Sequence, residues 1–446
     1  MTDSSRKKVL VLTYYWPPSG GAGVQRWLKF TKYMRDFDFE PVIYTADDPE
    51  YPSIDESLFK DLPVNLTMLK TPVWEPYKLY KRFTLQKKGH RINAGFLNQE
   101  KKKGIAEKIS VWIRGNWFIP DARKFWIKPS IRYLVNYLKE NPVDLIASTG
   151  PPHSMHLIGL GVSQKMNIPW IADFRDPWTK IDFYQDLMLT RRADRKHRKL
   201  ELSVLKNASH VTVNSHDMKR VFNEMGIEHV MVIPNGFDPE DFSDPEKTVE
   251  ATRSELDTKF SFTHIGTIVP SRNPETLWKV FAELVRTNED FARDLEIKLV
   301  GASDYSVSRS IQENDLDDWI SNIDYLPHKE AIHLLKHTQV LLLLINNTPF
   351  AKGVQPGKLF EYMCADRPIL AVGPPDGESA LFLNETKTGH IVDFTDYNGM
   401  KNQILDYYNQ YKNGNLKVEP DNIERYSRKT LTGTMTSLFN QILNST

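Results

Sequence analysis

Short apolar segments alternate with amphipathic helical patterns along most of the chain, and after a polar break the alternation starts again. Continuous apolar strands separated by helices are typical of parallel sheets covered on both faces, because the crossover helices shield both sides of the sheet. The pattern therefore predicts an α/β protein with two Rossmann-like, doubly wound domains. The predicted strands are 9–13, 41–45, 145–148, 170–173, 210–214 and 230–233 in the first half, and 260–266, 296–301, 340–345, 368–372 and 390–392 in the second.

The domain boundaries follow from the same alternation. The segment 234–257 between the two sets of strands is rich in Pro, Asp and Glu, which indicates a linker. We expect a first domain over residues 1–235, a second over 236–422, and a C-terminal helix over 423–446 that crosses back to the first. Doubly wound sheets bind ligands outside the carboxyl ends of their strands, so the two domains are expected to face a cleft there.

Charge and cysteine content narrow the class of protein. Lys and Arg total 58 against 57 for Asp and Glu, so the chain is not a general nucleic-acid binder. The single cysteine, Cys364, lies in an apolar stretch, where a buried and inert thiol is expected. The N-terminus has no signal-peptide pattern, and the longest apolar run, 340–345, is far too short to span a bilayer. A cytoplasmic protein is predicted.

One segment, 77–126, departs from the alternation and is expected to be an insertion in the first domain. Basic residues attract anionic headgroups and Trp favours the membrane interface, so the composition suggests peripheral docking on the inner face of the cell membrane. An ordinary helical insertion with a solvated basic face is the alternative. The basic residues are Lys78, Lys81, Arg82, Lys87, Lys88, Arg91, Lys101, Lys102 and Lys103, and the aromatic ones are Trp112, Trp117, Phe118, Phe125 and Trp126.

A glycine-rich loop, residues 20–23, follows the first predicted strand. Gly21 and Gly23 allow a close approach of the backbone to a ligand, and the amides at the start of the next helix suit a negative charge. Arg26, one turn into that helix, adds a cation. The loop lacks the dinucleotide fingerprint G-x-G-x-x-G, and a simple glycine-rich turn is the alternative.

Two more strand ends of the first domain carry polar side chains. His153 follows the strand 145–148, and Asp173, Arg175 and Asp176 follow or end the strand 170–173. Two carboxylates and a guanidinium suit the recognition of sugar hydroxyls, or a general base beside an acceptor hydroxyl. A structural Arg–Asp pair and a structural histidine remain the alternatives. We predict these four residues as catalytic.

The second domain offers a cation-rich site. Gly266 ends its first predicted strand, and Arg272 precedes the next helix. Gly357 opens a later helix on which Lys358 and Glu361, three residues apart, share one face. There the lysine can meet a phosphate, while the carboxylate can accept two hydrogen bonds from a ribose diol. A solvated Lys–Glu surface pair is the alternative.

Several motifs resemble the family 4 retaining glycosyltransferases, which have the GT-B fold. The segment 232–238, V-I-P-N-G-F-D, followed by Phe242, is similar to the family's PNG-x-D…F signature, and 358–362, K-L-F-E-Y, is similar to its nucleotide-sugar helix. The resemblance covers nearly the whole chain. It implies a nucleoside-diphosphate sugar donor, bound mainly by the second domain without a metal or cofactor. The sugar would move with retention to a glycan or lipid-linked acceptor, as in cell-surface polysaccharide synthesis.

The resemblance also implies roles for single residues. Glu361 would hold the ribose, Arg272 and Lys358 would bind the diphosphate, and the loop 20–23 would approach the phosphates from the first domain. A sugar-nucleotide epimerase of similar shape and a non-catalytic partner that keeps the fold are the competing interpretations.

Three positions depart from the family pattern. Gly353 stands where the first acid of the family's E-x7-E pair contacts the donor sugar. Thr267 replaces an arginine after the glycine of the second domain's first strand, and Thr149 stands where many members carry a histidine. The sequence therefore argues for a nucleotide diphosphate and leaves the identity of the sugar open.

Overall fold

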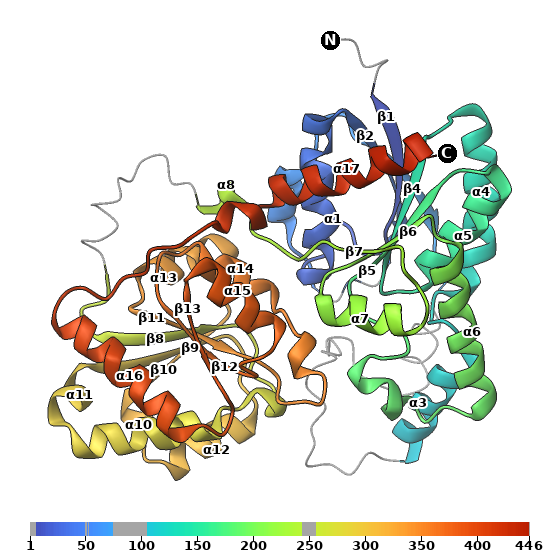
Figure 1. Cartoon of the computed structure of the whole chain (residues 1–446). Helices are drawn as coiled ribbons and strands as arrows, with labels where there is room; N and C mark the ends of the chain where they lie inside the picture. The colour runs from blue at the N-terminus through green and yellow to red at the C-terminus, as the bar shows by residue number, and fades with distance from the viewer. Residues whose placement is uncertain (1–5, 50, 52, 75–104, 243–255, 446) are drawn as a thin grey trace. The chain divides into compact units, whose positions relative to one another are not determined.

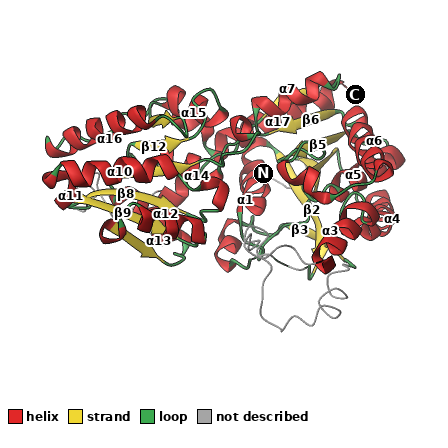
Figure 2. Ribbon diagram, turned by 90° about the horizontal axis from the view of Figure 1, so that it is seen from below, coloured by secondary structure: helices red, strands yellow, loops and turns green. Residues whose placement is uncertain are grey.

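The chain forms two compact units in the computed structural model, which describes residues 6–49, 51, 53–74, 105–242 and 256–445 (Figure 1). Unit 1 comprises Met1–Pro234 with Arg428–Thr446, and unit 2 comprises Asn235–Ser427. Each unit contains one wholly parallel sheet between layers of helices, as Figure 2 shows. The prediction of two doubly wound α/β domains is confirmed.

Unit 1 contains a sheet of seven strands in the order β3-β2-β1-β4-β5-β6-β7. Its strands are β1 (Lys7–Leu12), β2 (Phe39–Asp47), β3 (Thr67–Pro72), β4 (Leu145–Gly150), β5 (Trp170–Phe174), β6 (His210–Val213) and β7 (Val230–Val232). Its helices are α1 (Ala22–Tyr33), α3 (Ile105–Trp117), α4 (Lys124–Glu140), α5 (Ser154–Met166), α6 (Arg191–Asn207), α7 (His216–Glu224) and α17 (Arg428–Ser445).

Alternate residues of β1 enter two different cores, because successive side chains of a strand point to opposite faces. Leu10 and Leu12 join a core built with α4, α5, α6 and α7, whereas Val9 and Val11 join one built with α1 and α17. The C-terminal helix α17 therefore completes one face of the sheet in unit 1. Phe439 on this helix packs edge to face on Phe39 of β2, with ring centroids 5.3 Å apart.

A buried ion pair joins α1 to β5 within unit 1. The Arg26 guanidinium donates to both carboxylate oxygens of Asp173 at 2.9–3.2 Å, and neither side chain reaches solvent. The indole of Trp27 and the hydroxyls of Thr149 and Thr212 also donate to this carboxylate, at 2.7, 3.0 and 2.8 Å. One carboxylate thus connects α1, β4, β5 and β6.

Unit 2 contains a sheet of six strands in the order β10-β9-β8-β11-β12-β13. Its strands are β8 (Phe260–Ile265), β9 (Leu295–Val300), β10 (Ile320–Ile323), β11 (Val340–Leu344), β12 (Ile369–Val372) and β13 (Gly389–Val392). Its helices are α8 (Pro239–Phe242), α10 (Glu275–Thr287), α11 (Glu289–Asp294), α12 (Tyr305–Glu313), α13 (His328–His337), α14 (Gly357–Met363), α15 (Glu378–Thr386) and α16 (Tyr397–Lys412).

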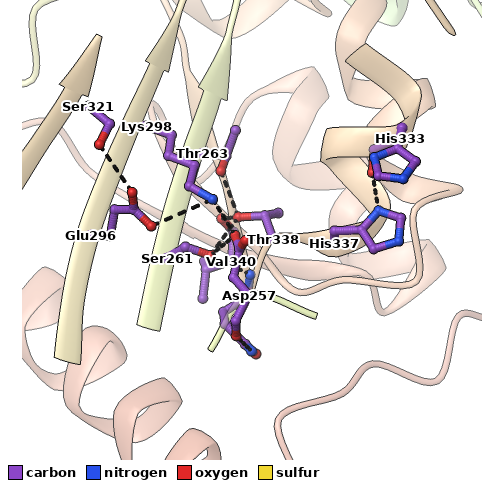
Figure 3. A network of polar contacts seen from close by, with 11 residues as sticks. Asp257, Ser261, Thr263, Glu296, Lys298, Ser321, His333, His337, Thr338 and Val340 are labelled. Carbon is purple, nitrogen blue, oxygen red and sulfur yellow. Dashed lines mark hydrogen bonds and ion pairs between the residues drawn. The ribbon is translucent and has the colours of Figure 1, made fainter. Parts of the chain in front are cut away.

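A polar network holds together the strand starts of unit 2, as Figure 3 shows. Lys298 of β9 and Ser261 of β8 both donate to the carboxylate of Asp257, at 2.7 and 2.6 Å. The hydroxyl of Thr338, just before β11, lies 2.6 Å from that of Thr263. These bonds lie at the amino end of the sheet, so the carboxyl end remains available for a ligand.

Two strands and one boundary differ from the predictions. The strands β3 and β10 were not predicted, because both lie at sheet edges and few of their residues are fully buried. The predicted insertion 77–126 extends too far, since Trp126 belongs to α4 and stacks on Tyr44 in the core, with ring centroids 5.3 Å apart. Its basic residues from Lys78 to Lys103 lie outside the described residues.

Cys364 is buried, as predicted, and burial raises the pKa of its thiol. None of the helices in the described ranges is long and apolar enough to cross a bilayer.

The Asp173 carboxylate yields a stability prediction. Asp173→Ala leaves the buried Arg26 charge without its counter-ion, so we expect the free energy of unfolding to fall by about 3–5 kcal/mol. Urea denaturation measures this loss. Asp217→Ala, which removes one surface ion pair with Arg220, serves as the control and should cost no more than about 1 kcal/mol. An equally small loss for Asp173→Ala would contradict the structural role.

Candidate functional site

The strand order of unit 2 reverses between β8 and β11, because β8 continues to β9 on one side and β11 to β12 on the other. Ligands of doubly wound sheets bind outside the carboxyl ends of the strands at such a switch point. Three segments meet at this edge. They are the loop after β8, the loop after β11 and the start of α14.

Lys358 extends from the first turn of α14 to the end of β8. Its amine lies 3.3 Å from Nε2 of His264, and a Cβ placed on Gly266 would come within 2.7 Å of it. Gly266 also has φ 121°, a backbone conformation that side-chain-bearing residues rarely adopt. Glycine is therefore required here both by the backbone and by the space that Lys358 occupies.

Arg272 brings a second cation to the same edge. Its guanidinium donates to the Thr267 carbonyl at 2.9 Å and to the side-chain oxygen of Asn346, after β11, at 2.7 Å. These bonds fix the guanidinium between the two loops, and its positive charge acts on Lys358.

His264 sets the environment of the lysine. Its Nδ1 lies 2.9 Å from the Leu342 carbonyl, which can only accept, so Nδ1 carries the proton and Nε2 faces Lys358 as an acceptor. Burial, and then the charge of Lys358, lowers the pKa of His264 well below its usual value. Burial, followed by the charge of Arg272, lowers the pKa of Lys358 to about 7. The site therefore holds concentrated positive charge that an anion would stabilise.

The remaining predicted residues of this site lie on α14. Tyr362 anchors the helix, because its hydroxyl accepts from the backbone amide of Ile265 at 2.9 Å. Glu361, half-buried and one turn after Lys358, partly offsets the lowering of the pKa of Lys358. Gly357 is exposed, and a Cβ there would meet no atom within 4 Å. The structure thus brings Gly266, Arg272, Lys358 and Glu361 to one edge, and Gly357 begins the helix that carries the last two.

The predicted residues of unit 1 gather at the corresponding edge of its sheet. The strand order reverses between β1 and β4, and the loop 20–23 follows β1. A Cβ on Gly23 would lie 2.7 Å from Nη1 of Arg175, and the Arg175 guanidinium donates to the Pro151 carbonyl at 2.7 Å. Gly21 is exposed with φ 93°, and Asp176 is exposed beside Arg175. The loops after β1, β4 and β5 therefore meet at Arg175.

His153 is enclosed rather than open to solvent. Its ring stacks on Trp178, with centroids 4.6 Å apart, and its buried Nδ1 has no hydrogen-bond partner among the described residues. Burial, with the neighbouring His156 as the next cause, lowers the pKa of His153 well below its usual value. The imidazole is therefore neutral near pH 7 and suits a hydrogen bond better than the role of a strong base.

Two predicted roles do not fit the geometry. Arg26 was predicted to bind the donor and Asp173 to act in catalysis, but each side chain is buried and satisfied by the other. Burial raises the pKa of Asp173, yet the Arg26 charge and the surrounding donors outweigh it and keep the pKa below its usual value. Thr149, at the position where many family members carry a histidine, is held in the same cluster. These residues stabilise the fold.

Sequence reasoning missed His264 and His156 as parts of the two edges. His264 had a visible signal, a histidine inside an otherwise buried strand two residues before a glycine. His156 lies on the inner face of α5, where Ser148 meets its Nδ1 at 2.9 Å. Nothing in the local pattern distinguishes it from other helix residues.

Comparison with solved structures places both units in one fold class. The chain is similar to sucrose-phosphate synthase from Thermosynechococcus elongatus, with a TM-score of 0.60, 13% identity, and 99% of this chain and 100% of that one covered. It is also similar to HepE of Anabaena, solved in complex with UDP-glucose, with a TM-score of 0.60, 13% identity and coverage of 98% and 100%. A protein from Listeria monocytogenes described as a UDP-N-acetylglucosamine 2-epimerase matches with a TM-score of 0.55, 10% identity and coverage of 99% and 98%. The fold is GT-B.

The sequence comparison matches one family over part of the chain. Residues 83–241 match the model of Glycosyltransferase Family 4, which confirms the resemblance that the motifs suggested. No curated protein matches the sequence. The family match covers this part of the chain, and the likeness of the whole chain to solved structures shows the GT-B fold.

The lowered pKa of Lys358 predicts how stability depends on pH. The folded pKa, about 7, lies below the value of about 10.4 for an unfolded lysine, so the charged amine destabilises the folded state. This penalty is absent above pH ~10.4 and grows as the pH falls towards 7, by up to about 1.4 kcal/mol per pH unit. Lys358→Met should remove this part of the slope in urea denaturation between pH 7 and pH ~10.

The matched control for this slope is Lys352→Met, at an exposed lysine in the preceding segment. Its slope should equal that of the wild type. A Lys358→Met variant that keeps the full wild-type slope would show that this lysine has an ordinary pKa.

Proposed function

We propose that the chain is a retaining glycosyltransferase that moves a sugar from a nucleoside-diphosphate sugar to a glycan or lipid-linked acceptor in cell-surface polysaccharide synthesis. The proposal rests on one observation. Two cations meet at the switch point of the sheet in unit 2, where Lys358 lies against Gly266 and Arg272 donates to the carbonyl of Thr267. The family assignment and the UDP-glucose in the HepE structure support a sugar nucleotide as the ligand.

The charge of the site suits the departing group of this reaction. Transfer breaks the bond between the anomeric carbon and a phosphate oxygen, and the acceptor hydroxyl forms the new glycosidic bond. Negative charge grows on the diphosphate as it leaves, and fixed cations stabilise it most where water is excluded. In this proposal Lys358 and Arg272 supply that stabilisation without a metal or cofactor, and Glu361 accepts hydrogen bonds from the ribose hydroxyls.

Unit 1 is proposed to bind the acceptor. Arg175 and Asp176 present a cation and an exposed carboxylate at the edge of its sheet, and neutral His153 lies close behind them. Asp176 is the group best suited to take the acceptor proton, because Asp173 is sequestered by Arg26. We further propose that the protein is cytoplasmic and binds peripherally to the inner face of the cell membrane.

The function is tested by ligand screening and product analysis. UDP-, GDP- and dTDP-sugars are compared by thermal shift, since a ligand that binds only the folded state raises the melting temperature. The sugar nucleotide that binds is then incubated with acceptors, and the anomeric configuration of the product is determined by NMR. A product with retained configuration is expected. A donor converted to its epimer, or no binding of any sugar nucleotide, would contradict the proposal.

Glu361→Ala should lower nucleotide-sugar affinity and activity by about tenfold or more, because it removes hydrogen bonds between a charged group and the ribose. Isothermal calorimetry with the screened ligand measures this change. Asp366→Ala, at an exposed acid just after α14, is the matched control and should bind as the wild type does. Unchanged affinity in Glu361→Ala would refute the role given to this carboxylate.

Nucleotide affinity should fall as the pH rises above 7. The free-site pKa of Lys358 is about 7, and a bound diphosphate raises it, so binding takes up a proton at higher pH. The pKa of His264 lies well below this range, whereas the pKa of Lys358 lies within it. Calorimetry with UDP should show up to about a tenfold loss per pH unit, and Lys358→Met should abolish the dependence. A pH-independent wild-type affinity would contradict this linkage.

A further inference from the structure

An exposed apolar face runs along α3 in unit 1. Ile109, Trp112, Ile113 and Trp117 recur at the three- and four-residue spacing that places side chains on one side of a helix, and all four are exposed. Trp117 is 66% exposed and Ile109 is 53% exposed. A helix normally buries such a face, so its exposure to solvent marks an interaction surface.

A basic face lies on the first half of α6. Residues 191–199 contain six cations against a single acid, Asp194, which is paired with Arg198. The other five cations, Arg191, Arg192, Arg195, Lys196 and Lys199, are exposed. The chain as a whole is nearly neutral, so this face is a local concentration of positive charge.

Hydrogen bonds place these two faces side by side. The Asn116 side chain at the end of α3 accepts from the backbone amide of Thr190 at 2.7 Å and donates to the Met188 carbonyl at 3.2 Å. Trp117 therefore lies next to the first turn of α6, where Arg191 and Arg192 begin. Met188 is itself exposed between the helices.

Lys124 extends the contact between the two faces. Its ammonium lies 4.7 Å from the ring centroid of Phe125 and 5.1 Å from that of Phe118. Burial, followed by the charge of Lys196 on α6, lowers the pKa of Lys124. Figure 1 shows α3 and α6 as neighbours at one end of unit 1.

We propose that this α3–α6 surface, formed by the exposed α3 face and the exposed α6 cations, docks unit 1 on an anionic lipid membrane. Cations beside exposed Trp and Ile match a bilayer surface, where anionic headgroups overlie an apolar region. A nucleic acid would pair with the cations but would leave Ile109 and Ile113 exposed to water. The proposal shifts the membrane contact predicted from segment 77–126 towards α6, which lies outside that segment.

Co-sedimentation of the full chain with vesicles tests the surface. The wild type should bind phosphatidylcholine vesicles that contain roughly 30% phosphatidylglycerol, and should bind pure phosphatidylcholine far more weakly. Binding should weaken as salt rises beyond roughly 0.15 M, because surface charge is screened. Absence of binding to the anionic vesicles, or complete displacement from them by equimolar duplex DNA, would overturn the proposal.

Two variants separate the contributions of the α6 cations and the α3 face. Arg191→Gln with Arg192→Gln and Lys199→Gln should lower vesicle affinity by about a hundredfold, at about fivefold per cation removed. Trp112→Ala with Trp117→Ala should lower it several-fold at every salt concentration, because apolar burial is not screened. The three α6 cations are exposed, so the first variant should keep the wild-type melting temperature. Wild-type vesicle affinity in both would refute the α3–α6 surface.

The matched control uses cations at the other edge of the same sheet. Lys139 and Lys165 are exposed near the ends of α4 and α5, just before β4 and β5 begin. Lys139→Gln with Lys165→Gln should bind vesicles as the wild type does, and an equal loss there would point to unspecific charge attraction and overturn the proposal.

The proposal rests on the proposed function only in assigning a purpose, access to a lipid-linked acceptor. Vesicle binding is measured without donor or acceptor, so the two can fail separately. Vesicle-binding variants should still bind the nucleotide in unit 2, and Glu361→Ala should still bind vesicles.

Discussion

A carboxylate enclosed by protein must be compensated by charge and hydrogen bonds, and in unit 1 this requirement fixes four elements at once. Asp173 on β5 is held by Arg26 and Trp27 of α1 and by hydroxyls of β4 and β6. Because α1 starts at the glycine loop after β1, this anchor also sets where that loop lies. Arg26 further donates to the carbonyl of Pro234, the last residue of unit 1 before the chain enters unit 2. The edge that carries Arg175 and His153 thus depends on a residue that never meets solvent.

In unit 2 the positive charge at the edge of the sheet is not compensated in this way. Lys358 faces a neutral histidine and a nearby guanidinium, and the half-buried Glu361 partly offsets the lowering of its pKa. Such an arrangement costs folding free energy that a bound anion would recover. In unit 1 the opposite charges of Arg26 and Asp173 stabilise each other. In unit 2 the charge of Lys358 is incompletely compensated at the place where the proposed ligand binds.

The fold was predictable because its signal is repeated and buried. Apolar strands such as 340–344 must be buried in the protein core. Their alternation with helical patterns was therefore enough to predict two doubly wound sheets. The edge strands β3 and β10 were not predicted from the sequence, because one face of each meets solvent and their polar residues resemble those of a loop. Lys358 and Glu361 could be placed together by helical spacing alone. Asp173 was misjudged because sequence shows that a carboxylate ends a strand, but not that Arg26, 147 positions earlier, already satisfies it.

The position of α17 has a consequence for how the protein is made. The last helix, 18 residues long, completes a hydrophobic core with α1, while unit 2 lies between the two parts of unit 1 in the sequence. A chain emerging from the ribosome can therefore finish unit 2 before unit 1 has its full core, the reverse of the usual order from the N-terminus. Until α17 has emerged, the β1 face built from Val9 and Val11 lacks the helix that covers it. Emergence of α17 after unit 2, rather than emergence of residues up to Pro234, completes the core of unit 1.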